Sequence, residues 1–173
     1  MSQNLNNYWK ALENKRYLHK TFLMGSTGFD LRHNADYTAF GFEDSGKNGN
    51  FSTVIVYSPL IENPDIFNLG LVVKNPDTDK WDDLYYTGND NAIKIFRTIA
   101  VTVDFFYRIH PNTKISFTGS DEARTKVYAK IIKARYKAIS ELYFIEATIG
   151  DDVIVPYDPA ESDNYKRFIL RQK

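Results

Sequence analysis

Residues 115–128 read Ile115-Ser116-Phe117-Thr118-Gly119-Ser120-Asp121-Glu122-Ala123-Arg124-Thr125-Lys126-Val127-Tyr128. An apolar strand over 114–118 meets a Gly-Ser turn, and the turn opens a helix over about 120–140. Gly119 permits the turn, and either Ser120 or Thr118 is expected to cap the helix. The stretch predicts a domain with both strands and helices, in which a strand leads through a tight turn into a helix.

Further strands are predicted on both sides of this stretch. Alternating and β-branched residues on either side of the glycine-rich turn 45–50 predict a hairpin over 37–57. The segments 67–73 and, as an optional fourth strand, 81–86 follow it. After the second helix, 142–149 and 153–157 predict another hairpin around Gly150, and 165–170 reads as a last edge strand.

A first long helix is expected at 91–109, with Asn89 or Asp90 as its cap. Its buried stripe repeats at helical spacing and comprises Ala92, Phe96, Ile99, Val103 and Phe106. The element order is βββ(β)-α-β-α-ββ. We therefore predict an α+β fold, with a mainly antiparallel sheet of about five to seven strands and two long helices packed on one face.

Residues 1–34 differ in character from the rest of the chain. Leu5, Trp9 and Leu12 have the spacing of a short amphipathic helix, and Gly25-Ser26-Thr27-Gly28 reads as a loop. We predict an N-terminal extension over 1–34 and a single α+β domain over 35–173.

Composition narrows the class of protein. The chain has 173 residues, with 22 Lys and Arg balanced by 22 Asp and Glu, so no global field draws it to nucleic acid or membranes. It has no cysteine, which excludes disulfides and cysteine-based metal sites. No apolar run reaches the length of a membrane span, and the start lacks a signal-peptide core. We expect a soluble, cytoplasmic protein without a membrane partner.

The second helix carries a line of cations. Lys126, Lys130, Lys133 and Lys137 recur at intervals of four, three and four, so they share one side of the helix. One interpretation is a surface that binds the phosphates of a polyanion. The other is an ordinary solvated face, because lysine is a good helix former.

The corner that opens this helix allows two interpretations as well. Free backbone N–H groups at Gly119 and Ser120 favour an anion, whereas the charges of Asp121 and Glu122 would repel one. Arg124 and Tyr128 lie one turn apart and either form a structural pair with a carboxylate from a neighbouring strand or touch a ligand. The candidate ligand-binding residues are Gly119, Ser120, Arg124, Lys126, Tyr128, Lys130, Lys133 and Lys137.

No catalytic or metal-binding constellation emerges from the spacing. Residues 41–48 approach the phosphate-loop pattern, but Asn48 replaces the hydroxyl residue and a strand follows where a helix is needed. The aspartates of 77–83 lack the glycine and glutamate of a calcium loop. His19, His33 and His110 are isolated. We expect no cofactor, no metal and no catalytic residue.

Several short motifs resemble a family of small bacterial stand-alone proteins known only as a domain of unknown function. The most specific is Gly119-Ser120 followed by Ala123-Arg124-Thr125 and Tyr128. Weaker ones are Phe67-Asn68-Leu69-Gly70, Asp82-Asp83-Leu84, Asn89-Asp90, Thr98-Ile99-Ala100, the Ser45-Gly46-Lys47 turn and Tyr165 to Phe168. The likeness runs from about Tyr37 to Arg171 and departs at the N-terminal extension and at Asn89-Asp90, where Asn-Gly-Asp is usual. It implies a stand-alone domain and no particular reaction.

Three functions remain open at this point. The first is a non-enzymatic module that binds single-stranded nucleic acid or another polyanion, with aromatic residues of the sheet stacking bases beside the basic helix. The second is a protein-interaction or antitoxin-like regulatory subunit, for which a homodimer is one arrangement. The third is an enzyme that acts on a small phosphorylated ligand through Arg124, Tyr128 and a nearby carboxylate.

Overall fold

The computed structural model describes residues 29–150 and 153–173. The expected helix of Leu5, Trp9 and Leu12 and the loop at 25–28 lie outside the described residues. By contact, the chain divides into two compact units. Unit 1 is the described part of Met1–Tyr57 with Gly70–His110, and unit 2 is Ser58–Leu69 with Pro111–Lys173. Strand β4 (Ile66–Asn75) contributes residues to both units.

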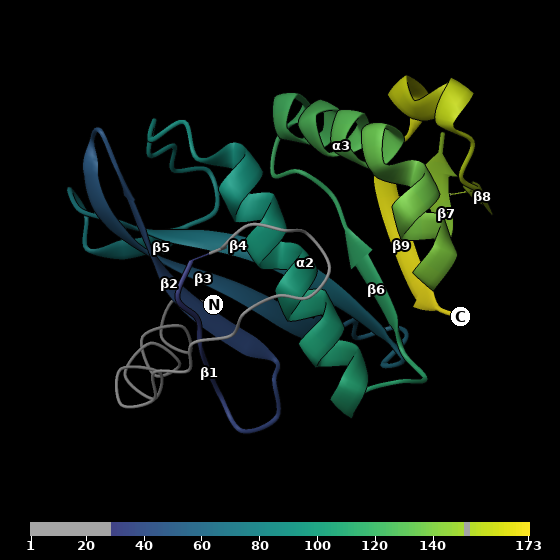
Figure 1. Ribbon diagram of the computed structural model, residues 1–173, viewed down its shortest axis with the longest axis horizontal. Coiled ribbons are helices and arrows are strands. Elements are labelled where there is room, and N and C mark those ends of the chain that lie inside the picture. The colour runs from purple at the N-terminus through teal and green to yellow at the C-terminus, as the bar shows by residue number, and fades with distance from the viewer. Residues whose placement is uncertain (1–28, 151–152) are drawn as a thin grey trace. The chain divides into compact units, whose positions relative to one another are not determined.

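The described residues form an α+β fold with two α-helices, one 3₁₀ helix and nine strands. In chain order these are β1 (Arg32–His33), β2 (Ala39–Gly46), β3 (Gly49–Pro59), β4, β5 (Lys80–Asp82), α2 (Ala92–Ile109), β6 (Lys114–Phe117), α3 (Glu122–Leu142), β7 (Tyr143–Ile149), β8 (Val153–Pro156), η1 (Pro159–Asn164) and β9 (Arg167–Gln172). The strands are hydrogen-bonded in the order β1-β2-β3-β4-β6-β9-β7-β8, with β5 beside β4 (Figure 1). The β4–β6 pair is parallel, and the sheet is otherwise mostly antiparallel.

The predicted α+β class is confirmed, but the predicted count of five to seven strands is too low. β1 is only two residues long and lies in the segment assigned to the N-terminal extension. β5 and β9 both form, although β5 ends at Asp82 instead of continuing to residue 86. Strands of two or three residues are too short to show the alternation by which strands are recognised.

Unit 1 contains the first predicted hairpin. β2 and β3 pair from Ala39↔Val56 to Gly46↔Gly49, so the turn consists of Lys47 and Asn48. Helix α2 packs on these strands (Figure 1). The ring of Tyr57 stacks on Phe106 with centroids 4.3 Å apart, and its hydroxyl lies 2.8 Å from Thr102 Oγ1.

Helix α2 differs from its prediction in its cap and in its buried stripe. Its N-cap is Asn91, whose side chain makes no capping bond, and not Asn89 or Asp90. Thr98 and Thr102 are fully buried, whereas Ala92 is exposed and Phe96 and Ile99 are only partly covered. Burial of these threonines is tolerated because each hydroxyl donates to a carbonyl of its own helix, Lys94 O at 2.9 Å or Ile99 O at 2.8 Å.

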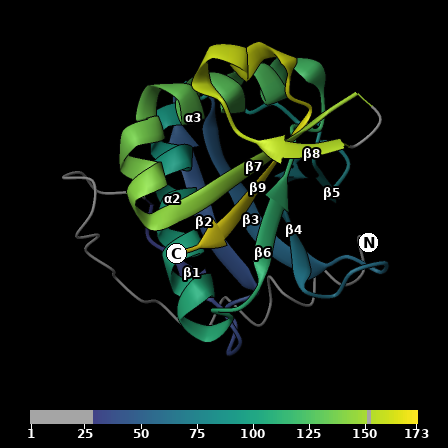
Figure 2. The ribbon, with the colours of Figure 1, turned by 90° about the vertical axis from the view of Figure 1, so that its right-hand side faces the viewer.

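Unit 2 places the first residues of β4 beside β6, followed by β9, β7 and β8. Alternate residues of these strands face α3, among them Phe117, whose ring meets Tyr128 edge-on at 6.0 Å. The ring centroids of Tyr136 on α3 and Tyr157 are 5.6 Å apart. In Figure 2, strands β6, β9 and β7 face the viewer and no helix crosses in front of them. The sheet of unit 2 therefore has one face covered by α3 and one face without a helix.

Strand β9 is not the edge strand that was predicted. It lies between β6 and β7, paired through Phe117↔Phe168 and Ala147↔Phe168. Phe168, Ile169 and Leu170 are all buried, as expected of a strand inside a sheet.

Candidate polyanion-binding surface

The Gly119–Ser120 corner between β6 and α3 packs closely against the backbone of the first turn of α3. A Cβ atom at Gly119 would lie 2.3 Å from the backbone nitrogen of Thr125, so only glycine fits there. The N–H of Gly119 donates to Thr125 Oγ1 at 3.1 Å. The glycine therefore serves the packing of the corner against the first turn of the helix.

The cap of α3 is Asp121, not Ser120 or Thr118 as predicted. The Asp121 carboxylate accepts from the backbone N–H of Arg124 at 2.7 Å. Thr118 Oγ1 instead donates to the carbonyl of Lys166 at 2.6 Å. A carboxylate also interacts more favourably than a hydroxyl with the positive end of the helix dipole.

Arg124 is held within its own helix turn. Its Nη1 donates to Ser120 Oγ at 2.5 Å, and its Nε lies 3.6 Å from Asp121 Oδ2. The carboxylate beside it therefore comes from the helix start and not from a neighbouring strand. With Asp121 beside it, the corner presents a carboxylate as well as a guanidinium group to any approaching anion.

Tyr128 lies one turn further along α3 and is half-buried against Phe117. Burial raises the pKa of its phenol above the ordinary value, and nearby Arg124 lowers that pKa by a smaller amount. The phenol therefore remains protonated at neutral pH and can donate a hydrogen bond.

The four lysines of the predicted stripe, Lys126, Lys130, Lys133 and Lys137, are all exposed. At 3.6 residues per turn they lie within about 60° of one another around the helix axis, over a length of about 16 Å. Between Ala123 and Ser140 the helix has no acidic residue. We call this set the α3 lysine stripe.

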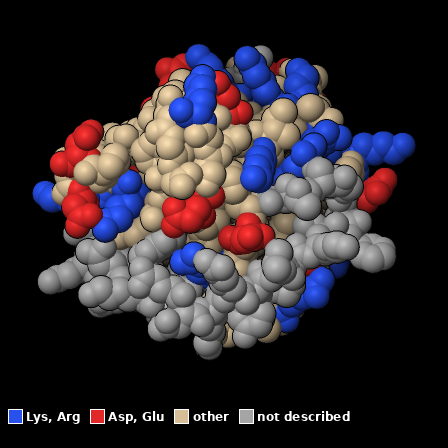
Figure 3. Space-filling view, turned by 60° about the vertical axis from the view of Figure 1, so that its left-hand side comes forward, with Lys and Arg blue, Asp and Glu red and all other residues tan. Residues whose placement is uncertain are grey.

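One member of the stripe has an acidic neighbour. Lys126 Nζ lies 2.6 Å from Glu122 Oε1, an i,i+4 pair that lowers the pKa of the Glu122 carboxyl. Such an exposed pair contributes little to stability and leaves the lysine accessible. On the face of the molecule in Figure 3, basic and acidic side chains both occur among wide areas of other residues. The α3 lysine stripe is a local concentration of one sign, because residues 123–140 include no acid.

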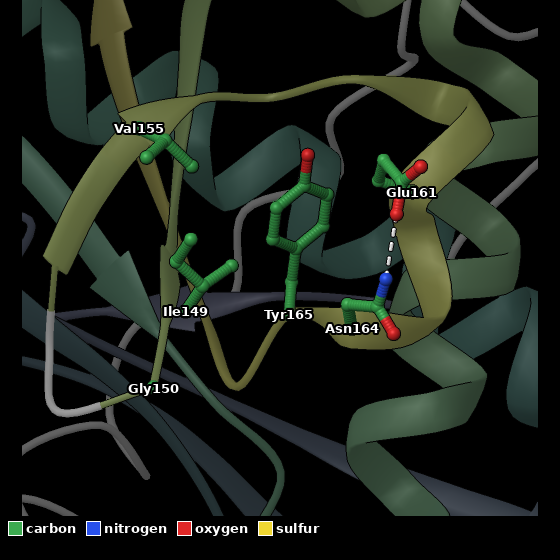
Figure 4. A pocket seen from close by; sticks show the side chains of 6 residues that line it. All are labelled: Ile149, Gly150, Val155, Glu161, Asn164 and Tyr165. Carbon is green, nitrogen blue, oxygen red and sulfur yellow. Dashed lines mark hydrogen bonds between the residues drawn. The ribbon is translucent and has the colours of Figure 1, made fainter.

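Unit 2 also has an open depression of about 320 Å³, which the sequence analysis did not anticipate. It is lined by Ile149, Gly150, Val155, Glu161, Asn164 and Tyr165. Figure 4 shows the Tyr165 ring between two aliphatic side chains and the Glu161–Asn164 pair, whose hydrogen bond is 2.6 Å long. Neither Arg124 nor Tyr128 lines it. No periodic signal marks this site, because its walls come from β7, β8 and η1.

Within residues 29–150 and 153–173, no three or more His, Asp or Glu side chains are grouped as a metal site would require. Neither helix in that part of the chain is long and apolar enough to cross a membrane.

Comparison with known proteins identifies a family for this chain. No curated protein and no solved structure matches the chain. A family model described as a family of unknown function, DUF6934, matches residues 26–173. The match starts before Tyr37, so it takes in part of the segment that the sequence analysis assigned to the extension. It confirms the resemblance that was drawn from the Gly119–Tyr128 motif and its companions: the chain belongs to the DUF6934 family of unknown function.

Proposed function

We propose that this protein is a non-enzymatic binding module that holds a polyanion, with single-stranded nucleic acid as the first candidate, along helix α3. The observation that carries the proposal is the α3 lysine stripe. Four exposed cations line one side of a helix in a chain whose formal net charge is zero. A phosphate backbone is the common biological ligand that presents anions in a line of this kind.

The physical basis is the release of counterions. Each lysine that neutralises a phosphate frees condensed cations, so affinity falls steeply as salt rises. A module with about four phosphate contacts should bind weakly at physiological salt and clearly at low salt. The Arg124 corner contributes less, because Asp121 already neutralises its guanidinium group.

The test is fluorescence anisotropy of a labelled single-stranded oligonucleotide at two salt concentrations. We expect binding that weakens with salt, and loss of most binding in the variant K126E/K130E/K133E/K137E. For a matched comparison, Lys133→Glu should weaken binding, whereas Lys80→Glu makes the same charge change at an exposed site on β5 and should not. Absence of binding by the unaltered protein at low salt would remove the proposal.

A second function, protein interaction, is supported by the edge strand β8. β8 ends the strand order, and its residues Val153 and Ile154 are 58% and 51% exposed. An exposed apolar edge strand is a template for pairing with another chain. A homodimer or a regulatory complex would cover it. Light scattering over a range of concentrations tests self-association, and Ile154→Lys should abolish any dimer formed through this edge.

A further inference from the structure

An exposed phenylalanine stands on the helix-free face of the unit 2 sheet. Ile145 and Ala147 of β7 are buried on the α3 side, and by strand alternation Phe144 points to the opposite face. Phe144 is 45% exposed. The phenylalanine ring has no polar atom and presents a flat apolar surface to solvent at this position.

Two cations lie beside the Phe144 ring. Arg171 is its direct cross-strand partner, with the guanidinium carbon 4.3 Å from the ring centroid. Lys173 Nζ lies 5.3 Å from the same centroid. The Arg171 group and the Phe144 ring together offer flat faces of the kind on which nucleobases stack.

The row continues across the sheet with a second cation. Lys114 of β6 pairs directly with Arg171 of β9, which places two positive residues opposite each other. Like charges in that position destabilise a sheet. Glu146 offsets this in part, because its Oε2 lies 3.0 Å from Lys114 Nζ. Lys114, Arg171 and Phe144 therefore form a row of two cations and one aromatic ring across this face.

This face connects to the α3 lysine stripe at the end of the helix. Lys173 N donates to the carbonyl of Leu142, the last residue of α3, at 3.1 Å. Lys137, the last lysine of the stripe, lies about 7 Å before Leu142 along the helix axis. Because Phe144 lies on the face of the sheet that α3 does not cover, a strand that follows the stripe reaches it by bending around the end of α3, past Leu142 and Lys173.

We propose that Phe144, backed by Arg171, is a base-stacking site, so the polyanion held along α3 is single-stranded nucleic acid. This inference rests on the proposed function and adds to it the group that distinguishes nucleic acid from other polyanions. The base lies on the Phe144–Arg171 platform, and Lys173 neutralises the adjoining phosphate. Charge complementarity favours a polyanion over a protein partner, because two cations, Arg171 and Lys173, lie beside the ring.

The experiment compares three ligands of equal length: oligo(dT), the corresponding abasic oligonucleotide and inorganic polyphosphate. All three carry phosphates, and only oligo(dT) carries bases. Phe144→Ala should weaken oligo(dT) binding about tenfold, within the range for loss of one stacked base, and should leave the other two affinities unchanged. Phe144→Leu keeps apolar volume without a ring and should behave like Phe144→Ala, whereas Phe144→Tyr should retain affinity.

The control variant is Ile61→Ala, which removes an exposed apolar side chain of unit 2 that has no ring. It should bind oligo(dT) like the unaltered protein.

The inference is overturned if Phe144→Ala and Phe144→Leu bind oligo(dT) normally, or if they lose all three ligands equally. In the first case the polyanion-binding function stands. If the unaltered protein binds none of the three ligands, the proposed function itself has failed. Thermal melting of each variant shows that it is folded, and the Leu and Tyr variants carry the test should the Ala variant unfold.

Discussion

The side chain of Asn89 fills the space beside Gly46, and a Cβ atom at position 46 would lie 2.6 Å from Asn89 Cγ. The two residues join the β2–β3 turn to the segment before α2. Asn89 is 6% exposed and its side chain makes three bonds: its Nδ2 donates to Asp44 O at 3.0 Å and to Gly49 O at 3.1 Å, and its Oδ1 accepts from Asn48 N at 2.9 Å. The residue predicted to cap α2 thus holds a hairpin turn instead.

Asn89→Ala should lower the free energy of unfolding by about 2–4 kcal/mol, because it leaves several covered backbone groups without a partner. Urea denaturation monitored by circular dichroism measures this. The matched control is Asn75→Ala, which removes a single exposed bond to Asp77 N and should cost less than about 1 kcal/mol. Equal effects of the two substitutions would contradict the role given to Asn89.

Gly46→Ala should destabilise unit 1 through overlap with Asn89, at a cost of about 1–3 kcal/mol. The cause is steric, so the same substitution should cost less once the Asn89 side chain is absent. A double-mutant cycle with Asn89→Gly, which also removes the Asn89 Cβ that lies 2.7 Å from the added atom, measures the coupling, which we expect to be at least about 1 kcal/mol. Additive effects would show that the two positions act independently.

The start of α3 gives a prediction that separates two capping residues. Asp121→Ala should cost about 1 kcal/mol, because it removes the acceptor for the Arg124 N–H. Ser120→Ala should cost less than about 0.5 kcal/mol, since the hydroxyl bonds to the Arg124 guanidinium group at an exposed site. Urea denaturation of both variants checks the order, and a larger loss for Ser120→Ala would refute the assignment of the cap.

Local patterns in the sequence sufficed for the elements that they directly encode. Apolar alternation and a glycine-rich turn located the β2–β3 hairpin, and lysine periodicity placed four side chains on one exposed side of α3. Both signals depend only on residues that are near one another in the chain.

Features that depend on residues far apart in the chain could not be predicted from local sequence patterns. The central position of β9 comes from its pairing with β6 and β7, and the run Phe168-Ile169-Leu170 gave only the hint that both of its faces are covered. The Phe144–Arg171 platform depends on strand register, which one sequence does not specify. The burial of Thr98 and Thr102 was missed because their hydroxyls bond to their own helix, so they behave as apolar residues.

Stability should fall in alkaline solution through Tyr128. Burial raises the pKa of this phenol in the folded protein above the ordinary value of 10.0, to which it returns on unfolding. Above about pH 10 the unfolded chain releases this proton while the folded chain keeps it. The contribution of the protonated phenol to the free energy of unfolding, which is complete below that pH, is therefore lost as pH rises through the folded pKa. Urea denaturation between pH 8 and 11 should therefore show a steeper loss of stability for the unaltered protein than for Tyr128→Phe, which has no proton to release. Parallel pH profiles would show that Tyr128 is not the group responsible, and an ultraviolet titration of the phenols would then locate the tyrosine that is.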